Sequence, residues 1–108
     1  MTFPDVNSRK YKTLSEGVRA RTFWGEKMLM ALVDIDANAI ISEHHHPHEQ
    51  VGIVLHGELD FYIEEEHRLL HEGDVYIIPS NINHKVICGS EPSQVLDIFS
   101  PVREEYKY

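Results

Sequence analysis

Short β-prone stretches, separated by residues that favour turns, follow one another along most of this sequence. They occupy residues 27–36, 51–56, 58–64, 67–70, 75–79, 84–88 and 94–100. Residues such as Asn38, Gly57, Gly73 and Pro79 end these stretches or supply turn conformations between them. Helical periodicity does not extend over more than about two turns, which is less than a stable helix needs. Because each short strand has one apolar face to bury, the pattern predicts an all-β protein, an antiparallel sandwich or barrel.

The clearest alternation of apolar and polar residues lies in the stretch 58–64. Leu59, Phe61 and Ile63 fall on one face of an extended chain, and Tyr62 and three acidic residues fall on the other. Gly57 joins this stretch to residues 51–56. The two stretches therefore predict a half-buried hairpin.

The length of 108 residues gives the chain enough apolar mass for one core. This predicts a single domain over residues 1–108, with an N-terminal arm over 1–15 and a C-terminal tail over 101–108. The single cysteine, Cys88, cannot form an internal disulfide, and the polar N-terminus has no apolar stretch typical of a signal peptide. No run approaches membrane-spanning length. We therefore expect a cytoplasmic protein that does not insert into a membrane.

The charge balance argues against one class of partner. The chain has 10 basic and 18 acidic residues, a formal net charge of -8 with histidine neutral. A surface this negative repels phosphate backbones, so nucleic acid is not expected as a partner.

Histidine is the most unusual feature of the composition, with eight residues in the chain and four of them between His44 and His48. His44 and His46 lie two apart, so both imidazoles leave one face of an extended chain, and Gln50 has the same parity. His84 begins a later strand, from which it can bring a third nitrogen. We expect these four residues to hold one divalent transition metal ion, nickel, iron, manganese, cobalt or zinc, with one or two coordination positions open.

The remaining histidines and Cys88 are not expected to bind the metal ion. His45 and His48 are interpreted as surface residues or residues behind the ligands, and His56, His67 and His71 lie near turns and are expected in solvent. Cys88 is interpreted as a small buried residue with no redox role. The competing interpretation of His44 and His46 is that they lie on a solvated strand.

The spacing of these residues resembles the two sequence motifs of the cupin superfamily. The first motif is matched by His44, His46, Gln50 and Gly57, and the second by Gly73, Pro79, Asn81 and His84. Asn38 and Asn81 stand where glycine is usual, Cys88 where asparagine often stands, and Gln50 where glutamate is usual. The resemblance implies a small antiparallel double-stranded β-helix, the jelly-roll barrel of cupins. The neutral Gln50 should sharpen the Lewis acidity of a bound ion and weaken its retention.

The sequence is also similar, over nearly its whole length, to small pectin-degradation cupins, in residues 44–61, 72–88 and 95–106. The resemblance implies a substrate, a 4,5-unsaturated uronate that is linearised to 5-keto-4-deoxyuronate, and a homodimer. It also implies working residues, with Asp97 catalytic and Phe99 and Arg103 binding this sugar acid. Asp97 shares a strand face with Val95 and Phe99, so it points into the barrel if that face is the inner one, and burial would raise its pKa.

Alternatives remain at each level. Asp97 can instead be an exposed edge residue, Phe99 a core residue and Arg103 a solvated tail charge. The chain can also be another metal cupin, such as an iron(II) dioxygenase, which oxygen consumption would reveal. A third alternative is a non-catalytic module that binds a sugar or a metal without turnover.

Overall fold

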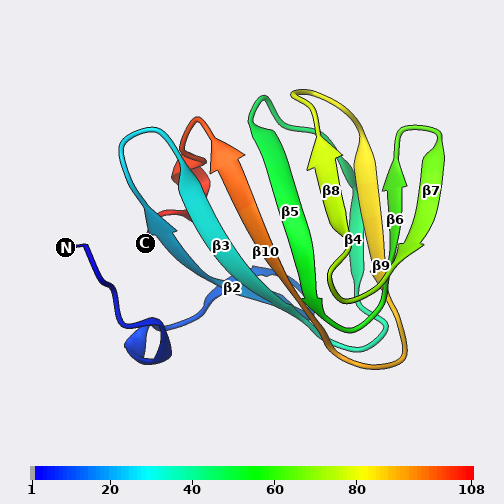
Figure 1. Cartoon of the computed structure of the whole chain (residues 1–108), viewed down its shortest axis with the longest axis horizontal. Helices are drawn as coiled ribbons and strands as arrows, with labels where there is room; N and C mark the ends of the chain where they lie inside the picture. The colour runs from blue at the N-terminus through cyan, green and yellow to red at the C-terminus, as the bar shows by residue number, and fades with distance from the viewer. Residues whose placement is uncertain (1) are drawn as a thin grey trace.

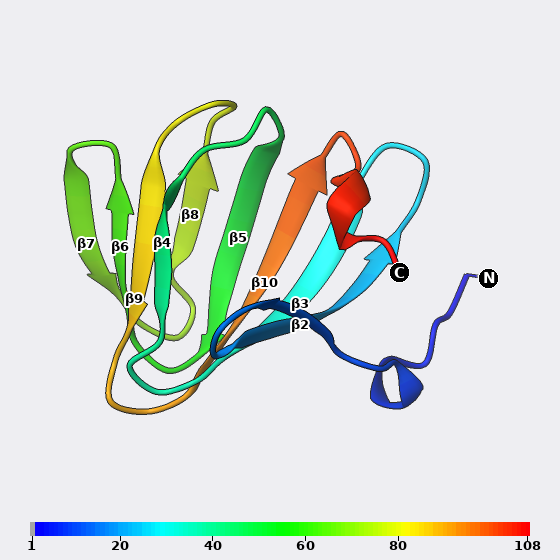
Figure 2. The same cartoon turned by 180° about the vertical axis from the view of Figure 1, so that it is seen from behind.

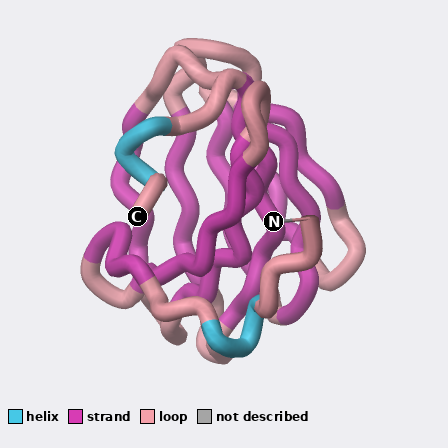
Figure 3. Tube along the Cα trace, turned by 90° about the vertical axis from the view of Figure 1, so that its left-hand side faces the viewer, coloured by secondary structure: helices cyan, strands magenta, loops and turns pink. Residues whose placement is uncertain are grey.

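Residues 2–108, which this computed structural model describes, form ten strands in two antiparallel sheets (Figures 1 and 2). The six-stranded sheet has the spatial order β1 (Lys12–Ser15), β2 (Val18–Trp24), β3 (Leu29–Ile35), β10 (Ser93–Ser100), β5 (Glu49–His56) and β8 (Val75–Ile78). The four-stranded sheet has the order β4 (Ile40–His44), β9 (His84–Cys88), β6 (Leu59–Ile63) and β7 (Glu66–Leu70). Two short 3-10 helices, η1 (Val6–Ser8) and η2 (Glu104–Tyr106), lie near the ends of the chain (Figure 3).

The chain changes sheet repeatedly from β3 onward. β3 lies in the larger sheet, β4 in the smaller, β5 in the larger, and β6 and β7 in the smaller, and β8, β9 and β10 continue the alternation. Two sheets wound together in this way form a double-stranded β-helix, or jelly roll. The all-β, antiparallel jelly-roll fold that the sequence predicts is therefore confirmed.

The core lies between the two sheets, where both contribute inward-facing residues. Leu59 and Phe61 are buried, as their alternation predicts, whereas Ile63 at the end of β6 is only half-buried. In β10 the residues Val95, Asp97 and Phe99 all face inward. The hydrophobic cluster from both sheets provides the rigid walls on which a site can be built.

Three strands, β1, β2 and β4, were not expected from the sequence. β1 uses the last four residues of the predicted N-terminal arm and pairs with β2. The inward face of β2 carries Val18, Ala20 and Thr22, whose small size and hydroxyl weaken the alternation signal. The predicted tail also contacts the fold, because Val102 is buried and η2 follows it.

Left-handed backbone conformations mark several turns. Asn38 and Asn81 both have φ of 64°, and Gly73 has φ of 90°. Asparagine tolerates this region better than most residues, so it replaces glycine at little cost.

Within the described chain no helix is long and apolar enough to cross a membrane.

Gly57 allows the turn between β5 and β6 to pack against β10. Its φ is 90°, and a Cβ atom there would lie 2.1 Å from Oγ and 2.9 Å from Cα of the buried Ser93. We expect G57A to lower the free energy of unfolding by about 3 kcal/mol, because it combines backbone strain with overlap of a buried neighbour. Urea titration measures this value.

Two matched glycine variants separate these two causes. Gly73 has the same φ, but a Cβ atom there would meet only open space, so G73A should cost only about 1 kcal/mol of backbone strain. Gly25 has neither restriction, and G25A should change stability by less than about 0.5 kcal/mol. Equal stabilities of G57A and G25A would contradict the packing argument.

Candidate metal centre

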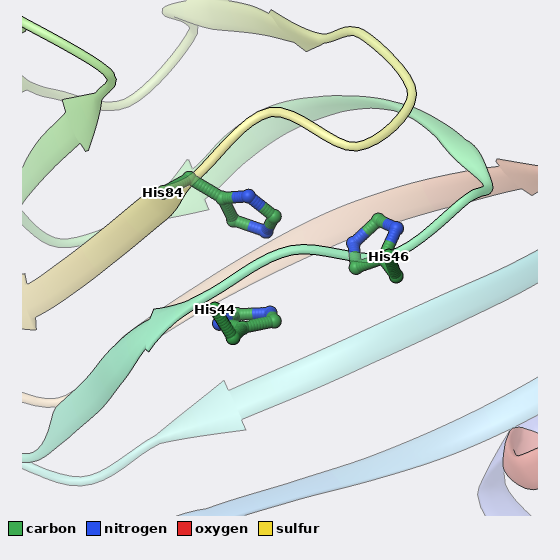
Figure 4. A group of neighbouring side chains, drawn as sticks. All are labelled: His44, His46 and His84. Carbon is green, nitrogen blue, oxygen red and sulfur yellow. The ribbon is translucent and has the colours of Figure 1, made fainter.

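Three histidines from separate parts of the sequence meet at one end of the space between the sheets. His44 ends β4, His46 follows it, and His84 begins β9. One ring nitrogen of each lies within 4.8 Å of those of the other two, and Figure 4 shows the three rings around a common space. Imidazole nitrogens in this arrangement suit a first-row divalent ion. The cluster could therefore hold a metal.

A β-bulge brings His44 to the inner face. Ile41 pairs with Val86 and His44 pairs with His84, so three steps along β4 oppose two steps along β9. The extra residue changes the parity of β4, and His44 faces inward although it lies three residues after the inward Ile41. As a result, the rings of His44 and His84 are 4.2 Å apart between centroids.

Loops rather than strand parity place His46. Residues 45–48 lie outside regular strands, so the extended segment assumed for His44 and His46 ends at His44. The backbone N–H of Asn81 donates to the carbonyl of His46 at 2.8 Å, and Asn81 adopts its left-handed conformation there. The turn before His84 therefore fixes the loop that carries His46.

Each of the three imidazoles is oriented by a backbone carbonyl two residues away. Nδ1 of His44 donates to Ser42 at 2.8 Å, Nδ1 of His46 to His48 at 3.0 Å, and Nδ1 of His84 to Ile82 at 2.8 Å. A neutral ring with its proton on Nδ1 has a free lone pair on Nε2. Such contacts orient metal-binding histidines and raise their basicity as ligands.

Gln50 completes the set of donors. Its Oε1 lies 3.0 Å from Nε2 of His46, and both atoms are buried acceptors when the Nδ1 of His46 carries the ring proton. Two lone pairs that face each other at this distance repel unless a positive charge lies near both. A cation is therefore the group that fits this donor set.

Burial keeps two of the histidines in the form that binds metal. Burial lowers the pKa of His84 to about 4, with the nearby His44, His46 and Arg103 charges acting in the same direction. Burial and the Arg103 charge also lower the pKa of His46. Neutral rings do not have to lose a proton before they bind an ion.

A cavity of about 290 Å³ extends into the barrel from the candidate centre, where it is lined by His44, Gln50 and His84. Asp97 lines it and is buried, because the face of β10 that it shares with Val95 and Phe99 is the inner one. Burial raises the pKa of Asp97 to about 6, although hydrogen bonds from Tyr76 and Gln50 and the charge of Arg103 act against this rise. The carboxyl group can therefore hold a proton near neutral pH.

Phe99 and Arg103 lie beside each other at the same cavity. The guanidinium carbon of Arg103 lies 5.1 Å from the Phe99 ring centroid and 4.0 Å from that of Tyr106, and only 11% of its side chain is exposed. Nε of Arg103 is 3.3 Å from the Glu105 carboxylate. Arg103 is therefore fixed in place by its neighbours and is not a solvated tail charge.

The other histidines and Cys88 lie outside the candidate centre. His45, His56, His67 and His71 are exposed, as expected. His48 is half-buried and supplies only its carbonyl, which accepts from His46. Cys88 is buried with 3% exposure, which agrees with its interpretation as a small core residue.

Comparison with known proteins identifies the family. Residues 31–99 match the cupin domain. The chain belongs to the cupin family. The pectin degradation protein KdgF of Dickeya dadantii (strain 3937) is 32% identical to this cupin over 98 residues, which cover 89% of each chain.

Solved structures agree with this assignment. KdgF from Halomonas sp. superposes on this cupin with a TM-score of 0.92 and 25% identity, over 98% of this chain and 100% of the other. An RmlC-like cupin from Shewanella frigidimarina NCIMB 400 gives a TM-score of 0.92 over 99% and 96% of the chains. Its identity of 22% shows the shared fold alone.

Two tyrosines at the cavity were not expected from the sequence. Tyr76 is buried and donates a hydrogen bond to Asp97. Tyr106 packs edge-on against Phe99 with ring centroids 5.4 Å apart. The alternation of β8 indicates that Tyr76 shares a face with Ile78, but its contact with Asp97 depends on strands distant in sequence, and no pattern in the tail indicates Tyr106.

Proposed function

We propose that this cupin is a metal-dependent enzyme that converts 4,5-unsaturated uronates to linear 5-keto-4-deoxyuronate. The observation that carries the proposal is one cavity that is lined by the protonatable Asp97, by Arg103 and by two of the three clustered histidines, His44 and His84. The similarity to KdgF proteins over most of the chain supports the same class of substrate. The cavity volume of about 290 Å³ suits a monosaccharide rather than a polymer.

The proposed reaction is an isomerisation in which no atom is gained or lost. A proton is added to C4 of the C4–C5 double bond, the bond between C1 and the ring oxygen breaks, and the C1 hydroxyl loses a proton. The products of these changes are a ketone at C5 and an aldehyde at C1. The reaction therefore needs a group that gives a proton at carbon and contacts that hold the ring in one orientation.

This chain has a residue for each of these tasks. Asp97 gives the proton to C4, because its pKa of about 6 leaves it partly protonated near neutral pH. Arg103 binds the C6 carboxylate through its guanidinium N–H groups, and Phe99 packs against the apolar face of the ring. His44, His46, Gln50 and His84 would hold the divalent ion, nickel, iron, manganese, cobalt or zinc. When bound, the ion supplies Lewis acidity toward the oxygens of the sugar.

The purified protein tests this function directly. Loss of the ultraviolet absorbance of the conjugated double bond, followed with metal-loaded protein and an unsaturated uronate, should accompany formation of the open-chain product. Saturable binding without any loss of absorbance would instead favour a non-catalytic binding cupin. Oxygen consumption with the iron-loaded protein would favour a dioxygenase.

We also propose that the chain forms a homodimer through the outer face of its six-stranded sheet. One apolar row crosses five neighbouring strands on this face. Its members, in spatial order, are Phe23, Met30, Ile98, Val51 and Ile77. Leu32, Leu96, Ile53 and Val75 form a second row beside it. In Figure 1 neither helix lies across this side of the sheet. Two chains of formal charge -8 would repel each other through most of their surface, so apolar rows suit contact with a second copy.

The variant M30K tests this interface. Met30 is 40% exposed and points away from the core, so a lysine there should leave the chain folded but place a charge in the dimer contact. Light scattering should show a mass of twice 12.5 kDa for the wild type and 12.5 kDa for M30K. L69K is the matched control, since Leu69 is 44% exposed on the smaller sheet. A monomeric wild type, or a dimeric M30K, would contradict the proposed contact.

A further inference from the structure

Tyr76, Gly52 and Asp97 form a row across the inner face of the six-stranded sheet. Tyr76 on β8 pairs with Gly52 on β5, and Gly52 pairs with Asp97 on β10. Tyr76 and Asp97 are therefore separated by one strand, a distance that a side chain can cross only if the middle position leaves room for it.

Gly52 leaves that room. A Cβ atom at position 52 would lie 2.3 Å from both Cζ and Oη of Tyr76, which is within the volume of the ring. The tyrosine thus lies over the backbone of β5, and any larger residue than glycine would displace it. Phe61 packs against the other side of the ring, with centroids 4.2 Å apart, so Tyr76 is held from two directions.

The hydroxyl of Tyr76 donates a hydrogen bond to Oδ1 of Asp97. Both side chains are buried, with 5% and 8% exposure, so water does not compete freely for this contact. Burial and the Asp97 charge raise the pKa of Tyr76 well above 10, which keeps the phenol protonated and therefore a donor. The bond fixes the plane of the carboxyl group and occupies one of its two oxygens.

We propose that Tyr76 is a positioning residue that, by its hydrogen bond to Oδ1 of Asp97, fixes the orientation in which this carboxyl group gives its proton to the substrate. The inference rests on the proposed function for the role of Asp97. A carboxyl group free to rotate would present either oxygen, and only part of its orientations would place a proton toward the substrate carbon. Gly52 supports this role, because its lack of a side chain leaves space for the Tyr76 ring to reach Asp97.

Kinetics of Y76F separate this role from simple core packing. The variant keeps the ring and removes only the hydroxyl, so we expect kcat to fall about tenfold while KM stays within about twofold and metal content is unchanged. Y62F is the matched control, because Tyr62 lies on β6 outside the cavity and stacks on His67. Its kcat should equal that of the wild type. An unchanged kcat in Y76F would overturn the inference.

A thermal cycle with D97A tests the contact without any need for turnover. In the wild type, Y76F removes a donor from a buried carboxyl, so Tm should fall by several degrees. In the D97A background the tyrosine hydroxyl has already lost its acceptor, so Y76F should leave Tm unchanged or raise it.

The two measurements distinguish the two proposals. If the wild type fails to act on any unsaturated uronate, the proposed function is wrong. The difference between the Tm shifts that Y76F causes in the two backgrounds still decides whether Tyr76 holds Asp97. Equal Tm decreases in both backgrounds would overturn the inference even in an active enzyme.

Discussion

D97A is expected to lower kcat for an unsaturated uronate by about 10²- to 10⁴-fold, which is the usual contribution of a general acid. Asp97 is buried in the cavity, and burial raises its pKa to about 6, so it is the carboxyl group there that can hold a proton at neutral pH. Alanine removes the proton donor but none of the four proposed ligands. The loss of ultraviolet absorbance should therefore almost stop while the metal content, measured by mass spectrometry, stays the same.

The pH dependence and a control variant sharpen this prediction. The acid form of Asp97 disappears as the pH rises through its pKa, so wild-type kcat should decline toward alkaline pH. Asp60 is an aspartate on the outer side of β6 that pairs with His67 at 2.9 Å, and D60A should keep full activity. A fully active D97A would exclude Asp97 as the proton donor. Loss of metal from D97A would mean that its effect on kcat is indirect.

The sequence predicted the fold well because strand signals are local. The alternation of residues 58–64 and the turn residues Gly57, Gly73 and Pro79 each depend on neighbours along the chain, and the structure confirms the jelly roll that they indicate. β2 and β4 gave weaker signals. Their inner faces carry small or polar residues, such as Ala20, Thr22 and His44, whose burial is decided by the facing sheet.

The candidate site could be predicted in its residue types but not in its geometry. The motif spacing selected His44, His46 and His84, which the structure brings together. It could not indicate the β-bulge before His44 or the contact of Asn81 with His46, because both depend on pairing between distant segments. Tyr76 was missed for the same reason, since its partner Asp97 is 21 residues away and reached over a third strand.

H84A is expected to weaken metal binding at least about 100-fold and to abolish turnover. His84 supplies a buried, neutral imidazole from β9, whereas His44 and His46 both come from the end of β4 and the loop after it. Without His84, β9 contributes no ligand and the ion keeps donors on one side only. Isothermal titration with nickel or zinc measures the affinity. The added ion should raise Tm of the wild type, because the three rings converge only in the folded chain, and should leave Tm of H84A nearly unchanged.

H45A is the matched control for this prediction, since it removes an imidazole from the same cluster of histidines. His45 is exposed and contacts Asn83 at 3.1 Å, away from the three convergent rings. Its variant should keep both metal affinity and activity. Equal losses in H45A and H84A would mean that the histidine-rich segment binds ions without a defined geometry. Full metal affinity in H84A would exclude the proposed centre formed by β4, β9 and the loop between β4 and β5. A residue that can be removed without any loss of affinity is not a ligand of the ion.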